Sequence, residues 1–349
     1  MTTSPVFDVS ELLEDVFAGR TLSVERARDV MGRLMDGKLS QMQAAALLAA
    51  LRTRGESVDE IVGFARAMRE RAVPVKVNAD GPLVDTCGTG GTGMNVFNVS
   101  TTAMFLAAAM GVRVAKHGNV GVTRRSGSAD VLQAAGARLD LSSEDVARAI
   151  ETLGVGFIFA RNHHPAMRFV APIRADLRAR TIFNNLGPLT NPAGAQRQLM
   201  GVFSPELARL LAEVLRGLGV QRALVVHGDG LDDVTVTGPT RVLELNESGD
   251  IEEYEVTPEE LGAGRHALEE LTGGDPAANA AIMRAVLRGD GPRAASDVVA
   301  VNAGAAAYLA GLAPDMAAGA QLARETLVSG AGLDKLEEYV GFTNSVPPH

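Results

Sequence analysis

The sequence predicts an α/β protein in which a small all-helical N-terminal domain precedes a larger α/β domain with a mainly parallel central sheet flanked by helices. Three observations lead to this fold class. Residues 1–73 carry only helical patterns, short apolar runs alternate with helical segments from about Pro74 onward, and one hairpin pattern appears late in the chain. Alternating strands and helices are typical of a parallel sheet covered on both faces. The 349 residues suffice for two domains, which we expect at 1–73 and 74–349.

Four helices are expected in the first domain. Their apolar residues recur at helical spacing, and Asp8 and Ser23 are possible N-caps of the first two. Glycines at 37 and 55 separate the later patterns. The expected helices cover 8–18, 23–35, 41–54 and 58–72, and we expect helices from about 165–195 to pack on this domain.

The second domain begins with a strand that ends near Asp85 and continues with alternating elements. Expected helices cover 98–110, 128–136 and 142–153, where Asp145 is placed for a capping box, and another begins behind Ser204 with proline at its first position. The chain is expected to be helical again from Pro276. The expected strands are 112–116, 157–159 and 223–227, with a hairpin at 241–246 and 251–256.

Bulk composition excludes several classes of protein. No run approaches the roughly 18–20 apolar residues that span a bilayer, which disfavours a transmembrane protein. No positive charge precedes an apolar stretch at the N-terminus, which disfavours a secretory signal. Cys87 is the single cysteine, so neither an intrachain disulfide nor a thiolate metal cluster is possible. The net charge of −9 disfavours nucleic acid as a partner. We therefore expect a cytoplasmic protein that binds neither nucleic acid nor membrane.

The most informative stretch is the glycine-rich segment between Asp85 and Thr101. Four glycines lie within the six residues 88–93, between an expected strand and an expected helix. Backbone N–H groups can approach an anion closely there, and the helix N-terminus adds its positive end. No Gly-Lys-Ser/Thr follows, which excludes a Walker loop, and the formal match to a dinucleotide loop lacks the acidic residue downstream. A flexible loop with ordinary helix capping is the alternative.

A second candidate site closes the next strand with Lys116-His117-Gly118-Asn119. Ligands bind at this carboxyl edge in open α/β sheets. Arg124 and Arg125 follow, ahead of the helix signal Ser126–Asp130. Four potential cations or donors are therefore expected in one region. The alternative is that Lys116 and the arginines are solvated loop charges, and for Arg125 taken alone this alternative is the favoured one.

Together these motifs resemble the anthranilate phosphoribosyltransferase family over essentially the whole chain. The glycine segment, the Lys-His-Gly-Asn block and Gly127–Asp130 are similar to family motifs. Further similar blocks are His163–Arg168, Arg180–Asn184, Leu186–Pro192, Val226–Asp233 and the ending Leu333–Thr343.

The resemblance implies a transfer of the 5-phosphoribosyl group from 5-phosphoribosyl 1-diphosphate to the amino group of anthranilate, with release of pyrophosphate, in L-tryptophan biosynthesis. Charge on the leaving pyrophosphate must be stabilised while a cation-like ribose carbon meets a weakly basic amine. Positioning and electrostatics can accomplish this, so no catalytic nucleophile is expected, and none with a convincing triad is present. Mg²⁺ is the implied cofactor and a homodimer the implied assembly.

The resemblance assigns site residues position by position. Metal ligands would be the oxygen donors Ser100, Asp232 and Asp233, of which the two carboxylates alone are equally compatible with a solvated turn. Anthranilate would meet Gly88, His117, Asn119, His164 and Arg174, with Arg174 in a bidentate pair with its carboxylate. The diphosphate donor would be held by Gly88, Gly91, Thr92, Val96, Asn98, Val99, Ser100, Thr101, Lys116, His117, Gly118, Asn119, Arg124 and Ser128.

Some positions depart from the family pattern. Thr92 stands in place of the usual aspartate of the glycine loop, Val96 in place of threonine, and Val120 in place of arginine. Arg124 replaces a serine and Asp233 a glutamate. We hypothesise that Arg124 or Arg125 replaces lost phosphate contacts, in which case Arg124→Ala raises the KM for the donor. The alternatives to the family activity are phosphorolysis by a pyrimidine-nucleoside-phosphorylase-like enzyme and a non-catalytic, nucleic-acid-binding relative.

Overall fold

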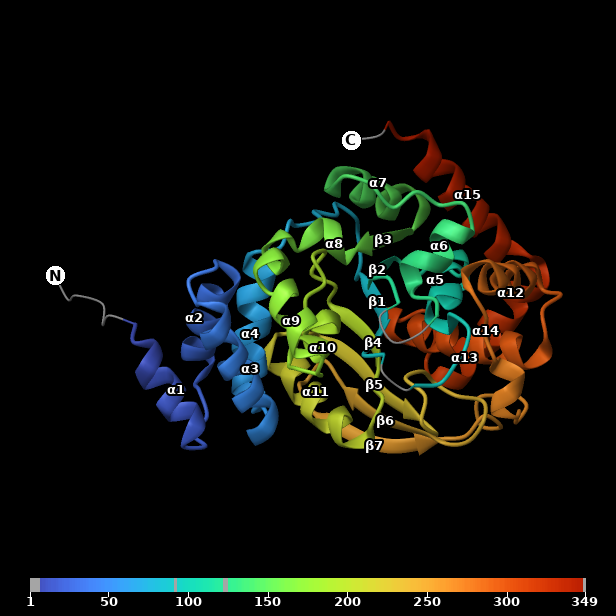
Figure 1. Cartoon of the computed structure of the whole chain (residues 1–349). Coiled ribbons are helices and arrows are strands. Elements are labelled where there is room, and N and C mark those ends of the chain that lie inside the picture. The colour runs from blue at the N-terminus through green and yellow to red at the C-terminus, as the bar shows by residue number, and fades with distance from the viewer. Residues whose placement is uncertain (1–6, 91–92, 122–124, 348–349) are drawn as a thin grey trace. The chain divides into compact units, whose positions relative to one another are not determined.

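The computed structural model describes residues 7–90, 93–121 and 125–347. It divides into two compact units (Figure 1). The helical unit contains the chain up to Ala72 together with His164–Thr190, and the α/β unit contains Val73–His163 together with the chain from Asn191 onward. The fold class expected from the sequence, a helical N-terminal domain and an α/β domain with a mainly parallel sheet, is confirmed.

The helical unit begins with four helices whose starts follow the capping signals of the sequence. They are α1 (Val9–Phe17), α2 (Val24–Met35), α3 (Gln41–Arg54) and α4 (Val58–Glu70). Asp8 and Ser23 cap the first two, as expected, and Ser40 and Ser57 cap the others in capping boxes. Helix α4 ends two residues before the expected Ala72. The later segment adds η1 (Pro165–Phe169), α9 (Ala171–Leu177), α10 (Phe183–Leu186) and η2 (Gly187–Leu189), with η1 and α9 in contact with α2 and α3.

Glu60 joins three parts of the helical unit from a fully buried position at the start of α4. Its Oε1 accepts from the Leu22 amide at 3.0 Å, and its Oε2 accepts from the Ser57 amide at 2.9 Å. The Arg54 guanidinium, which is also largely buried, pairs with Oε2. A buried carboxylate is tolerated when it is paired and hydrogen-bonded in this way.

We expect Glu60→Gln to lower the free energy of unfolding by about 2 kcal/mol, because the amide cannot accept from all three donors and leaves the Arg54 charge without its partner. Urea unfolding followed by circular dichroism measures the change. Glu14→Gln, at an exposed position on α1, is the control that leaves the unfolding midpoint in place. Equal midpoints for the two variants would contradict a stabilising role of the buried pair.

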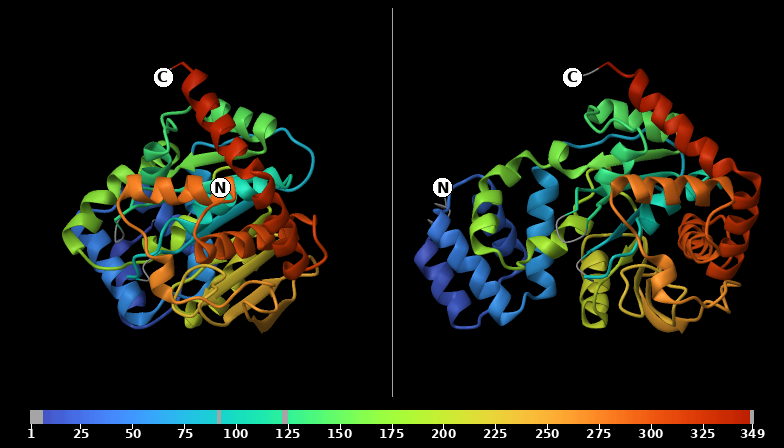
Figure 2. Two further views of the ribbon diagram at one scale, coloured as in Figure 1. Left: turned by 90° about the vertical axis from the view of Figure 1, so that its right-hand side faces the viewer. Right: turned by 45° about the vertical axis from the view of Figure 1, so that its right-hand side comes forward.

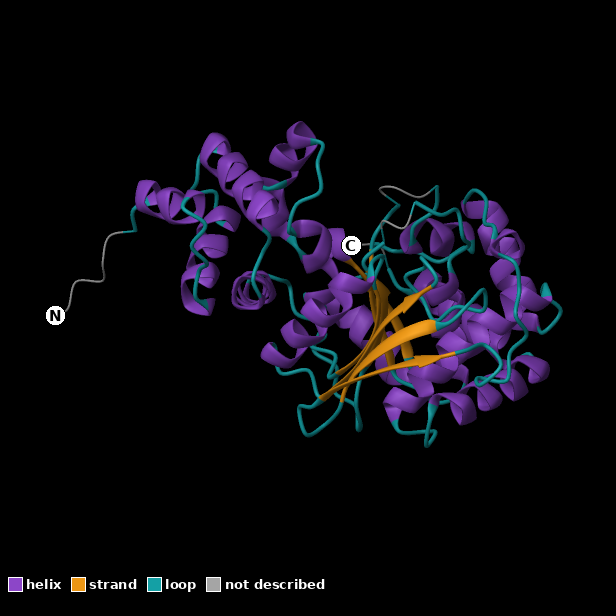
Figure 3. Cartoon of the chain, turned by 90° about the horizontal axis from the view of Figure 1, so that it is seen from below, coloured by secondary structure: helices purple, strands orange, loops and turns teal. Residues whose placement is uncertain are grey.

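The α/β unit is built on one seven-stranded sheet (Figure 3) with strand order β3-β2-β1-β4-β5-β6-β7. The first five of these strands run parallel, and β6 and β7 form the expected antiparallel hairpin. The strands are β1 (Val84–Gly88), β2 (Val114–Gly118), β3 (Val155–Phe159), β4 (Arg197–Gly201), β5 (Arg222–Gly228), β6 (Thr240–Leu245) and β7 (Ile251–Val256). Strand β4 was not expected from the sequence, and β2 lies two residues later than expected.

Helices cover both faces of this sheet. Buried residues of α5 (Val99–Ala109) and α13 (Arg293–Ala310) pack on one face with Val84, Val114 and Leu199, and α7 (Ser143–Leu153) packs on the other with Ala115 and Ile158. The C-terminal helices gather on one side of the unit (Figure 2). The remaining elements are α6 (Ser128–Ala134), α8 (Ala160–His163), α11 (Pro205–Gly217), η3 (Leu268–Leu271), α12 (Pro276–Arg288), α14 (Met316–Ser329) and α15 (Ala331–Ser345).

The segments at which the chain enters and leaves the α/β unit are bonded to one another. The Val73 amide donates to the His163 carbonyl at 2.8 Å, and the Val75 amide donates to the Pro192 carbonyl at 3.1 Å. The His163 ring Nδ1 also lies 3.1 Å from the Val73 carbonyl oxygen. These contacts hold the entry and exit points of the α/β unit at one place.

Candidate functional site

Glycines end four neighbouring parallel strands of the sheet. Gly118, Gly88, Gly201 and Gly228 are the last residues of β2, β1, β4 and β5, and Gly88 pairs with Gly201 in the ladder. Parallel strands end at one edge of the sheet, where open α/β sheets bind their ligands. Since glycine has no side chain, another segment can approach the backbone of this glycine row very closely.

The segment that lies against the glycine row contains Asp232 and Asp233. A Cβ atom at Gly88 would lie 2.4 Å from Asp232 Oδ2, and one at Gly201 would lie 1.7 Å from the Asp232 carbonyl oxygen. A Cβ at Gly228 would lie 2.6 Å from the Asp233 carbonyl oxygen. The two aspartates are only 6% and 9% exposed. They are therefore packed against the sheet edge, and the alternative of a turn with solvated carboxylates is wrong.

A tight turn delivers the two aspartates to this place. Asp229 and Gly230 adopt positive φ angles of 48° and 86°, and Gly228 and Leu231 exchange backbone hydrogen bonds of 3.0 and 2.8 Å. Asp232 then reaches the glycine loop, where its Oδ2 accepts from the Gly90 amide at 2.9 Å. One carboxylate oxygen thus fixes the start of the glycine-rich segment.

Lys116, on β2, places a positive charge near the same edge of the sheet. Its side chain is 1% exposed, and its ammonium group donates to the Ser100 hydroxyl at 3.1 Å and to the Thr86 carbonyl. Burial lowers the pKa of Lys116, while Asp85, Cys87, Asp233 and Asp232 act in the opposite direction. The ammonium and the two carboxylates therefore interact electrostatically, and the same ammonium contacts Ser100 at the start of α5.

Asp85 balances Lys116 from the neighbouring strand. It is fully buried, and its Oδ1 accepts from the His117 amide at 3.2 Å. Burial raises the pKa of Asp85 to about 6, against the opposing effects of Asn191, Lys116 and the His117 amide. The Asp85 side chain, near the start of β1, thereby links this strand to the C-terminal end of β2.

Asn98 organises the start of α5. It occupies the N-cap position, but its side chain makes no capping bond. Its Nδ2 instead donates to the Ser126 carbonyl at 3.1 Å, and its Oδ1 accepts from the Ser126 hydroxyl and from Asn279 Nδ2 at 3.1 and 3.0 Å. Asn279, which is buried on α12, also accepts from the Gly274 amide at 2.7 Å. The Asn98 side chain therefore joins α5 to α12 and to the loop before α6.

The other assigned residues of the α/β unit fall into two groups. Val96, Val99 and Thr101 are buried, and Val96 forms a β-bridge with Thr272. The rest lie around the β2–α6 connection: His117 is buried, Asn119 is exposed, and Gly118 and Ser128 are half-buried. A Cβ at Gly127 would lie 2.2 Å from the Gly121 amide, so this loop folds tightly on the start of α6. Gly91, Thr92 and Arg124 lie outside the described residues.

The two assigned residues of the helical unit are His164 and Arg174. The His164 side chain is buried immediately before η1. Arg174 lies on α9 with its guanidinium carbon 5.7 Å from the centroid of the Phe183 ring, and burial lowers its pKa. Among the described residues, no Asp or Glu forms an ion pair with Arg174. Its charge is thus available for an anionic ligand. His163, the other histidine of the pair, belongs to the α/β unit, where burial lowers its pKa.

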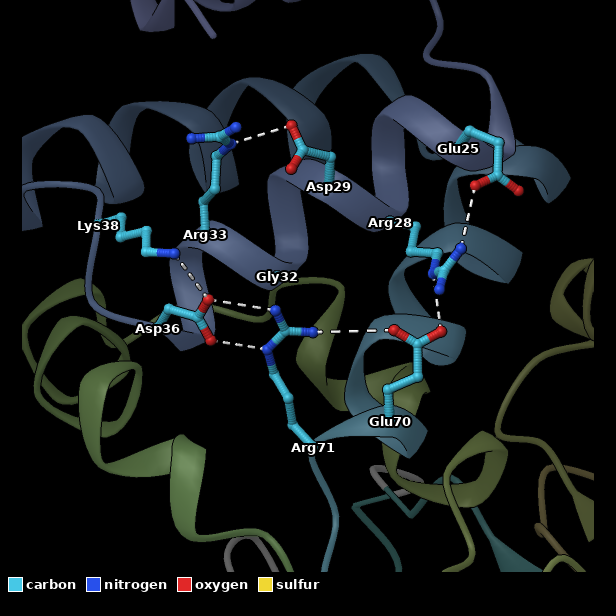
Figure 4. Close-up of a pocket in the computed structure, with 9 residues that line it drawn as sticks. All are labelled: Glu25, Arg28, Asp29, Gly32, Arg33, Asp36, Lys38, Glu70 and Arg71. Carbon is cyan, nitrogen blue, oxygen red and sulfur yellow. Dashed lines mark hydrogen bonds and ion pairs between the residues drawn. The ribbon is translucent and has the colours of Figure 1, made fainter. Parts of the chain in front are cut away.

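A surface cavity of about 360 Å³ in the helical unit is a different kind of feature (Figure 4). Arg71 pairs with Asp36 through Nε and Nη2, at 2.8 and 3.2 Å, and Arg28 pairs with Glu70 at 2.7 Å. The Arg71 contact holds the pKa of Asp36 down at about 2. Because the side chains satisfy one another, the cavity is an ion-pair network rather than a ligand site. Its lining consists of Glu25, Arg28, Asp29, Gly32, Arg33, Asp36, Lys38, Glu70 and Arg71.

Sequence reasoning missed three residues that shape the site. Gly201 ends the strand that was not expected, and Asn279 and Asn302 lie on C-terminal helices far along the chain from the loops they contact. No local signal in the sequence identifies these roles.

None of the helices in the described part of the chain combines the length and the apolar character that a membrane-spanning helix requires.

Comparison with known families divides the chain near Ala72, where the first segment of the helical unit ends. Residues 80–333 match the family described as "Glycosyl transferase family, a/b domain". Residues 10–72 match the family described as "Glycosyl transferase family, helical bundle domain".

Curated relatives match the chain over nearly its whole length. The anthranilate phosphoribosyltransferase of Rubrobacter xylanophilus is 56% identical over 331 residues, which cover 95% of this chain and 96% of the relative. The enzyme of the same name from Deinococcus radiodurans is 51% identical over 325 residues, covering 93% and 96%.

Solved structures show the same fold. The crystal structure of anthranilate phosphoribosyltransferase from Thermus thermophilus matches with a TM-score of 0.91 and 49% identity, covering 97% of this chain and 100% of that one. The enzyme from Saccharomyces cerevisiae in complex with PRPP and Mg matches with a TM-score of 0.89 and 25% identity, covering 97% and 98%.

Proposed function

Because the chain belongs to the anthranilate phosphoribosyltransferase family, we propose that it transfers the 5-phosphoribosyl group of 5-phosphoribosyl 1-diphosphate to the amino group of anthranilate in L-tryptophan biosynthesis. The products are N-(5-phosphoribosyl)anthranilate and pyrophosphate. The structural observation that supports this assignment is that Asp232, Asp233, Lys116 and Ser100 come together at the glycine row.

The reaction exchanges one bond at the ribose C1 for another. The bond to the diphosphate oxygen breaks, the anthranilate nitrogen bonds to C1, and the amine loses a proton. Negative charge grows on the leaving diphosphate, where the buried Lys116 ammonium, the Ser100 hydroxyl and the positive N-terminus of α5 would stabilise it. The backbone of the glycine-rich segment that follows β1 would let the diphosphate lie close to N–H groups, so that positioning would account for much of the rate.

The residues at the sheet edge also fit the proposed cofactor Mg²⁺. Among the described residues, no cluster of three or more His, Cys, Asp or Glu side chains is placed to hold a metal. Two buried carboxylates, Asp232 and Asp233, are nevertheless present, and the Ser100 hydroxyl lies 3.1 Å from the Lys116 ammonium. Mg²⁺ is commonly bound by one or two carboxylates together with substrate phosphates and water. When bound, the ion would neutralise charge on the diphosphate.

Arg174 would bind the carboxylate of anthranilate, since its guanidinium presents paired donors that match a carboxylate and pairs with no acidic side chain among the described residues. We expect Arg174→Ala to raise the KM for anthranilate by about 10- to 100-fold, the value of a charge-assisted hydrogen-bond pair. Steady-state kinetics with anthranilate varied measures this change. The KM for the diphosphate donor and the kinetics of the control Arg52→Ala, exposed on α3, stay the same; a matching rise in the donor KM would contradict the assignment.

The assay for the reaction is the loss of anthranilate fluorescence in the presence of the diphosphate donor and Mg²⁺. We expect loss that requires all three components. No loss, together with phosphate-dependent cleavage of nucleosides or salt-sensitive binding of DNA, would overturn the proposed function and favour one of its alternatives.

We propose further that the enzyme is a homodimer that assembles through its helical unit. Phe17 on α1 and Met42 on α3 are 58% and 83% exposed, on two helices that contact each other. Exposed apolar side chains on adjacent helices are typical of a self-complementary interface. Size-exclusion chromatography with light scattering tests this, and a monomer at micromolar concentration refutes it. The single, buried cysteine supports a place in the reducing cytoplasm, which cell fractionation would test.

A further inference from the structure

Asn302 is an isolated amide in the middle of an apolar helix. It lies on α13, where its neighbours from Val298 to Leu309 are almost all alanine, valine, glycine and leucine, and its side chain is 1% exposed. Burying an amide without partners costs several kcal/mol, so a buried amide in such a helix is expected to be fully hydrogen-bonded. Its partners therefore indicate why an amide is present.

The Asn302 side chain holds one residue of the chain from both sides. Its Oδ1 accepts from the Val234 amide at 3.1 Å, and its Nδ2 donates to the Val234 carbonyl at 2.8 Å. Nδ2 also donates to the Val298 carbonyl one turn earlier in α13, at 2.8 Å. Two bonds to a single residue fix both its position and its orientation, which one bond would not do.

Val234 is the residue immediately after Asp233. On the other side of the aspartates, Gly228 and Leu231 are bonded to each other, and Asp232 rests on the backbone of Gly201. The two carboxylates are thus carried by a short segment that is fixed at the sheet edge at one end and by Asn302 at the other.

We infer that Asn302 is a positioning residue for the metal–diphosphate site, one that acts through the Val234 backbone to set the direction of the Asp232 and Asp233 carboxylates. The inference rests on the proposed function of these aspartates and adds a role for a residue of α13. Groups that orient metal ligands without touching the metal commonly contribute 10- to 100-fold to metal affinity, so an effect of about that size is expected.

The test measures metal binding without turnover. Mn²⁺ is titrated into the protein with 5-phosphoribosyl 1-diphosphate and without anthranilate, and free Mn²⁺ is followed by electron paramagnetic resonance. We expect Asn302→Ala to weaken Mn²⁺ binding by about 10- to 100-fold. The control is Val301→Ala, at a fully buried position next to Asn302 on the same helix, which loses packing but keeps the Val234 contacts and therefore the wild-type Mn²⁺ affinity.

A second variant covers the case in which Asn302→Ala does not fold. The shorter hydroxyl of Asn302→Ser can bond within the helix but cannot reach both atoms of Val234, so the same weakening of Mn²⁺ binding is expected. Wild-type Mn²⁺ affinity in a folded Asn302 variant, or equal weakening in Val301→Ala, would overturn the inference. Wild-type protein that lacks transferase activity would instead overturn the proposed function, so the two failures are distinguishable.

Discussion

Lys116→Met is expected to lower kcat/KM for the diphosphate donor by about 10²- to 10³-fold, the range typical of removing a buried electrostatic stabiliser of a transition state. The ammonium is 1% exposed and bonded to Ser100 and Thr86, so water cannot replace it. Methionine retains most of the apolar stem and removes the charge. The variant therefore isolates the electrostatic contribution from the packing of the side chain.

Steady-state kinetics with the donor varied measures the effect, and Lys76→Met, at an exposed lysine of the same unit, is the matched control with unchanged kinetics. A Lys116→Met enzyme with near wild-type kcat/KM would show that this ammonium does not stabilise the departing diphosphate.

The same substitution has a signature in the pH dependence of stability. Burial raises the pKa of Asp85 to about 6, and the Lys116 charge opposes that rise. A carboxyl whose pKa is higher in the folded state than in the unfolded state binds its proton more tightly when the protein is folded. Its contribution to the free energy of unfolding is therefore present at low pH and is lost as the pH rises through the folded-state pKa. Removing Lys116 raises the pKa of Asp85 further. The difference in Tm between variant and wild type should therefore widen as the pH rises above about 6, as calorimetry would show.

Local signals in the sequence account for most of the fold. Helix α3 has the expected bounds, and Asp8 and Ser23 cap α1 and α2 as expected, because capping and helical periodicity depend on neighbouring residues. Strand β4 carries no such signal. Its sequence, Arg-Gln-Leu-Met-Gly, has a buried glutamine beside two apolar residues, so neither alternation nor an apolar run marks it as a strand.

The candidate site likewise contains residues that local sequence signals indicate and residues that they do not. Glycine-rich segments and the Lys-His-Gly-Asn block indicate an anion site because their chemistry is local. Asn302 lies 68 residues from the residue it holds, and Asn279 lies 181 residues from Asn98. Such contacts exist only after the sheet and the C-terminal helices have come together. The candidate ligand-binding residues can therefore be proposed from local motifs in the sequence, whereas the residues that hold them in place cannot.

Gly201→Ala is expected to reduce kcat/KM by at least about 10²-fold, because a Cβ at this position would lie 1.7 Å from the Asp232 carbonyl oxygen and 2.2 Å from its carbonyl carbon. The strand cannot move aside, since β4 is paired on both sides and the Gly201 carbonyl accepts from the Thr89 amide at 2.8 Å. The Asp232 backbone must shift instead, and the carboxylates shift with it. We expect an accompanying loss of stability of about 1–3 kcal/mol from overpacking.

The kinetic and thermodynamic effects of Gly201→Ala separate in the comparison with Gly341→Ala on α15. A Cβ at Gly341 meets no atom within 4 Å, and alanine there favours the helix, so activity stays unchanged and stability does not fall. Mn²⁺ binding with the donor, measured on folded Gly201→Ala, should weaken together with kcat/KM. If the variant folds and binds Mn²⁺ as tightly as the wild type, the contact between β4 and Asp232 does not set the carboxylates, and the glycine row serves only the packing of the sheet edge.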